Sequence, residues 1–102
     1  MNHLNSILLE GNLENEPKLT AIDGLAPICS FNLASERYSR TDEEFEKHTS
    51  VISVRVNGRL AECCSSQLTQ GRGVRVVGRI KQEDEIGVYI IAEHVEFKPV
   101  FK

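Results

Sequence analysis

The sequence predicts an all-β fold, a five-stranded Greek-key barrel with one short α-helix after the third strand. Apolar and polar residues alternate with the period of a β-strand in segments 28–33, 49–56 and 74–81. Apolar residues recur with helical spacing only between residues 60 and 68. We expect residues 1–102 to form one domain, because this length supports one hydrophobic core.

The first two strands are expected on either side of a polar connection. Residues 6–11 form a short apolar run that ends at a glycine, which is typical of a strand before a turn. In the second strand Cys29, Phe31 and Leu33 share one parity. Successive side chains of a strand point to opposite faces, so this set is expected to be buried.

The middle of the chain contains a charged connection and the third strand. Residues 37–47 are rich in charged side chains, and we expect them to form a mobile loop. The third strand places Ile52, Val54 and Val56 on one face and Arg55 on the other.

A short helix is expected next, since Leu60, Cys64 and Leu68 recur at i, i+4 and i+8 and Gly71 follows. Cys64 is then expected to be a small buried hydrophobic residue. Strands over residues 74–81 and 88–97 close the chain. A helix inserted after the third strand of a small all-β domain is the pattern of the oligonucleotide-binding barrel.

The sequence offers little for catalysis or for binding a metal or cofactor. Its three histidines are scattered, and Cys63 and Cys64 are adjacent, without the spacing of a zinc-binding pair. Residues 71–73 lack the remaining glycine and lysine of a phosphate loop. The acidic run at Asp42 lacks the spacing of an EF-hand. We therefore expect no enzymatic activity, no metal ion and no cofactor.

The net charge of −3 conceals a basic central segment. From Lys47 to Lys81 there are seven basic residues and one acidic residue, a local charge of +6. Such a local field attracts a polyanion even where the net charge is negative, although ordinary solubilising charge is an alternative explanation. Single-stranded nucleic acid binding combines a basic groove with aromatic rings that stack on bases.

Four blocks of the chain resemble the bacterial single-stranded-DNA-binding protein family. They are residues 5–17, 31–34, 58–62 and 71–80, and they occur in the order and spacing of that family. The resemblance extends to short relatives of that family, such as the primosomal replication protein, which share its fold. The resemblance implies an oligonucleotide-binding barrel without a cofactor, single-stranded DNA as partner, assembly as a homo-dimer or homo-tetramer, and cytoplasmic work in replication, recombination or repair.

On this resemblance Arg59 takes the place of a basic residue at the turn into the helix, and Tyr38 stands near a stacking aromatic. Tyr38 is the best stacking candidate, with a surface tyrosine on its own strand end as the alternative, and Tyr89 is a weaker candidate that could instead cap the barrel. Val51 and Asn57 fall where the family often has stacking rings. The residues expected to bind single-stranded DNA are Arg37, Tyr38, Arg40, Lys47, Arg55, Arg59, Arg75, Arg79, Lys81 and Tyr89.

Two surface features suggest further roles. The acidic run 83–85 either repels the DNA strand and so tunes its affinity, or protects an exposed hairpin edge from pairing with another sheet. Val51, Val77 and Ile91 lie on the parity opposite the main apolar set, which favours covering by a second copy.

The alternative function is a protein–protein interaction module on the same barrel, with DNA binding weakened or lost. Replication or repair proteins are then the expected partners. No apolar run approaches the roughly 20 residues that span a bilayer, and no secretory signal is visible, so we expect a cytoplasmic protein without a membrane partner.

Overall fold

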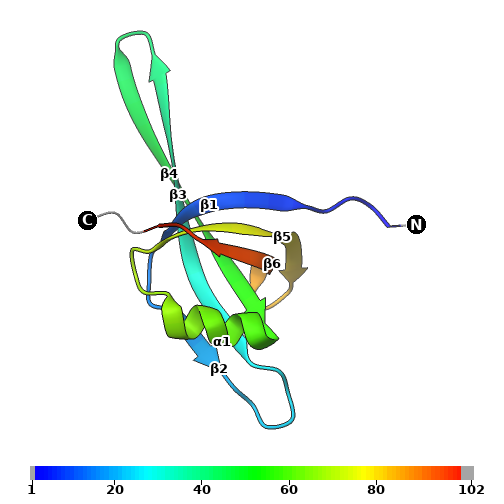
Figure 1. Cartoon of the computed structure of the whole chain (residues 1–102). Coiled ribbons are helices and arrows are strands. Elements are labelled where there is room, and N and C mark those ends of the chain that lie inside the picture. The colour runs from blue at the N-terminus through cyan, green and yellow to red at the C-terminus, as the bar shows by residue number, and fades with distance from the viewer. Residues whose placement is uncertain (1, 100–102) are drawn as a thin grey trace.

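The computed structural model describes residues 2–99, which form a closed five-stranded barrel with one helix, and it confirms the predicted fold class (Figure 1). The elements in chain order are β1 (Ile7–Leu13), β2 (Lys18–Thr20), β3 (Ile28–Thr41), β4 (Glu44–Asn57), α1 (Gly58–Gln67), β5 (Gly73–Glu83) and β6 (Gly87–Phe97). β2 is a short additional strand that pairs only with β3.

The barrel closes because β1 pairs with two different strands. Residues 7–12 of β1 pair with β5, and residues 12–13 pair with β3. The remaining neighbours follow in the order β5, β6, β4 and β3. Gly11 lies where β1 passes β3, and a Cβ there would be only 2.9 Å from the carbonyl carbon of Ala34. The absence of a side chain therefore permits the closure.

The core is formed by the inward faces of the strands and by one side of α1. Cys29, Phe31 and Leu33 are buried, as their shared parity predicted. Helix α1 covers one end of the barrel (Figure 1), with Ala61 and Cys64 turned inward. The remaining buried apolar residues are Leu13, Val54, Val56, Leu68, Val74, Val76, Tyr89, Ile90, Ala92 and Val95.

Burial protects two of the three thiols. Burial raises the pKa of Cys29, and it raises the pKa of Cys64 to about 12, while Cys63 stays partly exposed on α1. Because the thiolate is the reactive form, we expect iodoacetamide near pH 8 to label one thiol rapidly and all three after unfolding. A mass spectrum showing rapid double labelling of the native protein would contradict this burial.

Residues 37–47 do not form the expected loop. They form the outer part of the hairpin between β3 and β4, which we call the arm, and Figure 1 shows it projecting from the barrel. Cross-strand side-chain pairs stabilise such a hairpin. Lys47 Nζ lies 3.1 Å from Glu36 Oε1, and the guanidinium of Arg40 lies over the ring of Phe45, 5.4 Å from its centroid.

Candidate nucleic-acid interface

A row of side chains crosses four neighbouring strands on the outer face of the barrel. Ser30 of β3 pairs with Arg55 of β4, and Arg55 pairs with Ile91 of β6. Ile91 pairs in turn with Arg79 of β5. Directly opposed residues of a sheet point to the same face, so two guanidinium groups flank one half-buried isoleucine. We call Ser30, Arg55, Ile91 and Arg79 the basic row.

Arg75 was expected to bind DNA, but the structure places it between two carboxylates. Its Nη2 lies 2.9 Å from Glu10 Oε2, and its Nη1 lies 3.6 Å from Glu96 Oε2. The register of β1, β5 and β6 sets these three residues side by side. Lys98 Nζ also approaches Glu10 Oε1 at 2.8 Å. The positive charge of Arg75 is therefore largely neutralised within the sheet.

Glu10 makes this cluster sensitive to acid. The hydrogen bonds from Lys98 and Arg75, together with their positive charges, hold the pKa of the Glu10 carboxyl below its ordinary value of 4.5. A lowered folded-state pKa contributes stability above the unfolded pKa, and this contribution disappears as the pH falls through the folded value. We expect Glu10→Gln to lower the melting temperature slightly near pH 7, because the cluster is half exposed, and not near pH 2. If Glu10→Gln lowers the melting temperature equally near pH 7 and near pH 2, as followed by circular dichroism, this linkage is wrong.

Lys47 and Lys81 also have acidic neighbours. Lys47 of the arm is paired with Glu36, just outside the arm, and Lys81 Nζ lies 3.7 Å from Glu83 Oε1. Both pairs are exposed, and exposed pairs contribute little to stability, so a DNA phosphate could replace the carboxylate. Within residues 2–99, the basic residues of the expected set that form no ion pair are Arg37, Arg40, Arg55, Arg59 and Arg79.

The unpaired arginines do not all lie together. Arg55 and Arg79 share the basic row, whereas Arg59 lies in the first turn of α1 and Arg37 and Arg40 lie on the arm. The sequence-based set therefore divides into one compact pair on the barrel and single cations on other elements.

Tyr89 does not present its ring to solvent. It is 2% exposed, and the guanidinium carbon of Arg55 lies 4.8 Å from the ring centroid. Burial, together with a hydrogen bond to Glu83 and the charge of that carboxylate, raises the pKa of the Tyr89 hydroxyl. A base can reach the ring of Tyr89 only by displacing Arg55.

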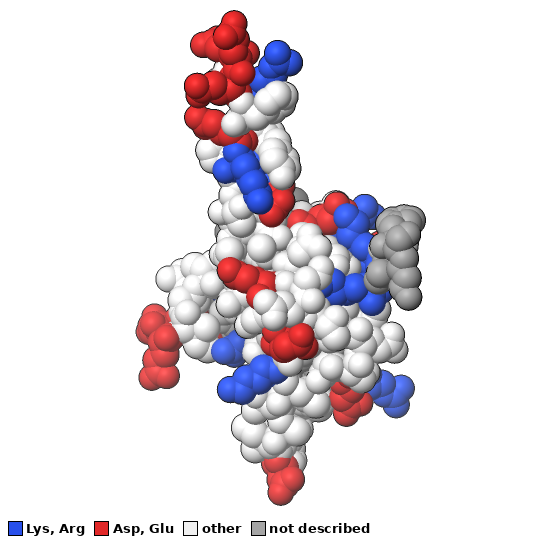
Figure 2. Space-filling model, turned by 90° about the vertical axis from the view of Figure 1, so that its left-hand side faces the viewer, with Lys and Arg blue, Asp and Glu red and all other residues white. Residues whose placement is uncertain are grey.

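Tyr38 remains accessible on the arm. Its side chain is 64% exposed, opposite Lys47 in the hairpin. The free end of the arm is acidic, as Figure 2 shows. A DNA strand that contacts Tyr38 would therefore be repelled if it continued to the tip. The acidic residues of this end are Asp42, Glu43, Glu44 and Glu46.

Two apolar side chains lie on the outer face of the barrel. Ile91 does so, as its parity predicted, and it lies between Arg55 and Arg79 in the basic row. Leu8 is 68% exposed and pairs with Val77 on the outer face, a position that the sequence analysis missed. The apolar run around Leu8 has no alternation, so it does not reveal which side chain points outward.

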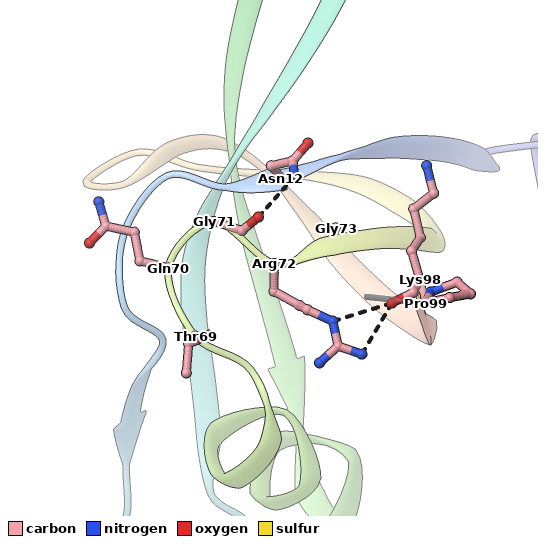
Figure 3. Close-up of a pocket in the computed structure, with 8 residues that line it drawn as sticks. All are labelled: Asn12, Thr69, Gln70, Gly71, Arg72, Gly73, Lys98 and Pro99. Carbon is pink, nitrogen blue, oxygen red and sulfur yellow. Dashed lines mark hydrogen bonds between the residues drawn. The ribbon is translucent and has the colours of Figure 1, made fainter. Parts of the chain in front are cut away.

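One cleft lies outside the basic row. It has a volume of about 620 Å³ and is lined by residues of β1, of the segment between α1 and β5, of the first position of β5 and of the segment that follows β6 (Figure 3). Arg72 Nε and Nη2 donate to the carbonyl oxygen of Lys98 at 3.2 and 3.1 Å, and the Asn12 side chain donates to the Gly71 carbonyl at 2.9 Å. These bonds connect chain segments and indicate a structural role.

The described part of the chain holds no cluster of three or more metal-ligating His, Cys, Asp or Glu side chains. In residues 2–99 the helix is too short to cross a membrane.

Comparison with known proteins points to one family. The model of the single-strand binding protein family matches residues 4–97. The single-stranded DNA-binding protein of Aquifex aeolicus is 32% identical over 100 residues, covering 90% of this chain and 68% of that protein. Its counterpart from Caldanaerobacter subterraneus is 32% identical over 78 residues, covering 76% of this chain and 51% of that protein.

Solved structures show the same similarity. The single-stranded DNA binding protein of Thermus aquaticus superposes with a TM-score of 0.80 at 26% identity, over 94% of this chain and 50% of that one. A small single-stranded DNA-binding protein from Streptomyces coelicolor gives a TM-score of 0.78 at 26% identity, over 96% of each chain. The chain thus spans 68% and 51% of the two curated relatives above, and nearly all of the small Streptomyces protein.

Proposed function

This chain belongs to the single-strand binding protein family, and on that premise we propose that it binds single-stranded DNA, without catalysis, on the outer face of β4, β6 and β5. The basic row supports this location. Arg55 and Arg79 have no carboxylate partner within residues 2–99, and Ile91 lies between them. Cations for phosphates beside an apolar surface for bases are the combination that a single strand requires.

A fluorescence anisotropy titration tests this function. A labelled single-stranded oligonucleotide of about 20 nucleotides is titrated at about 20 and 200 mM salt, beside a duplex of the same sequence. We expect the single strand to bind more tightly than the duplex and its affinity to fall with salt, because bound phosphates release counterions. Absence of binding at the lower salt concentration would refute the proposal.

The second candidate is a protein–protein interaction module on the same barrel, with replication or repair proteins as partners. Two observations favour it: the acidic end of the arm (Figure 2) and the neutralisation of Arg75 by Glu10 and Glu96.

We also propose that the acidic run 83–85 tunes DNA affinity. The contact between Glu83 and Lys81 supports this, since Glu83 neutralises a cation on the same face as Arg79. In either function the expected setting is cytoplasmic DNA replication, recombination or repair.

We also propose that the protein forms a homo-oligomer through the outer face of β1. Leu8 is 68% exposed beside Val77, and soluble monomers rarely leave such apolar pairs uncovered. We expect Leu8→Glu to reduce the mass measured by light scattering to that of a monomer, because a carboxylate would be buried at the interface. Leu25→Glu is the control, since Leu25 is 67% exposed in a turn. A monomeric mass for the unmodified protein at about 10 µM would refute this proposal.

A further inference from the structure

We propose that Arg55 provides a base-stacking surface of this protein, with its guanidinium supported from beneath by Tyr89; this inference rests on the proposed function. The guanidinium carbon lies 4.8 Å from the centroid of the Tyr89 ring. The guanidinium group therefore lies against the face of the ring. The Arg55 side chain is only partly buried, so the other side is open on the outer face of the barrel.

Burial holds the ring beneath Arg55 in place. Tyr89 lies in β6 and is only 2% exposed. Within residues 2–99 no carboxylate forms an ion pair with Arg55. No such partner therefore competes with the Tyr89 ring for the guanidinium group. A cation held over an aromatic face is stabilised by the ring quadrupole. Arg55 therefore loses little conformational freedom when a base covers it, which favours binding.

Within residues 2–99 the barrel itself has no strongly exposed aromatic ring on which a base could stack instead. The strongly exposed rings of residues 2–99 are Tyr38 and Phe45, and both lie on the arm. Bases stack on arginine guanidinium planes as well as on rings. Ile91 lies next to Arg55 in the register and supplies apolar contact beside the stacked base, while Arg79 on its far side is placed for a phosphate.

The substitution Arg55→Lys separates stacking from charge, because lysine keeps the cation and loses the plane. Binding is measured to an oligothymidylate and to an abasic strand with the same number of phosphates. We expect Arg55→Lys to bind the oligothymidylate about fivefold or more weakly, the range of one stacking contact, with unchanged affinity for the abasic strand. The salt dependence should stay unchanged, since the number of phosphate contacts is the same.

Arg75→Lys is the matched control, since Arg75 lies on the same barrel but is held by Glu10 and Glu96, and it should bind both strands like the unmodified protein. Thermal melting establishes that each variant is folded. If Arg55→Lys binds both strands like the unmodified protein, the stacking role is wrong while DNA binding stands. If the unmodified protein binds neither strand, the proposed function itself fails.

Discussion

Replacing Gly78 by alanine is expected to lower the free energy of unfolding by about 3 kcal/mol or more, the upper range for overpacking a tight site. A Cβ at this position would lie 2.9 Å from the carbonyl carbon of Ile91 and 3.1 Å from the Cα of Ala92. Both atoms belong to the backbone of β6, which cannot move away without breaking its pairing with β5. The register between these strands also shifts between Val77 and Gly78.

The matched control for this substitution is Gly73→Ala in the same strand. A Cβ there would meet first the Cδ of Lys98 at 3.3 Å, which is part of a flexible side chain. We expect the free energy of unfolding to change by no more than about 1 kcal/mol, since the Lys98 side chain can move and alanine restricts the unfolded chain. Urea denaturation followed by circular dichroism measures both variants. If Gly78→Ala is as stable as the unmodified protein, β5 and β6 do not approach as closely as described here.

Removing the Arg79 side chain is expected to flatten the salt dependence of DNA binding. Each phosphate neutralised on a single strand contributes about −0.7 to the slope of log K against log salt, so Arg79→Ala should lose about that amount. Arg79 is exposed in the basic row and has no ion-pair partner within residues 2–99. The affinity of Arg79→Ala for the single strand at low salt should fall several-fold, because one phosphate contact is lost.

Arg75→Ala is the control for Arg79→Ala, with the same charge removed from the same strand. Because Glu10 and Glu96 already neutralise Arg75, its removal should leave the slope unchanged and lower the melting temperature instead. Anisotropy titrations at four salt concentrations provide the slopes. A slope for Arg79→Ala equal to that of the unmodified protein would exclude Arg79 from the interface.

The barrel could be predicted because most of its strands are half buried. In residues 28–33, 52–56 and 74–78 the alternation reflects one face in the core and one face turned toward solvent, whereas residues 49–51 and 79–81 are exposed throughout. The arm could not be predicted in this way. Almost all of its residues are exposed on both faces, so no hydrophobic period marks it as a hairpin. Its two strands are paired continuously from Arg37 with His48 to Thr41 with Glu44, and Arg40 lies over the ring of Phe45.

The candidate interface could be predicted only in part. Strand parity correctly placed Arg55 and Arg79 on the outer face. It could not distinguish Arg79 from Arg75, because the carboxylate of Glu10 that neutralises Arg75 comes from a strand 65 residues away in the sequence. Nor could it show that Arg55 covers Tyr89, since that contact depends on the parallel pairing of β4 with β6.

The most direct test of the DNA-binding face is a titration of the isotopically labelled protein with a single-stranded oligonucleotide, followed by amide chemical shifts. We predict the largest changes at Arg55, Ile91 and Arg79 of the basic row, with little change at Glu10 and on the outer side of α1. Changes that concentrate at Glu10 and α1, with the basic row unaffected, would contradict it.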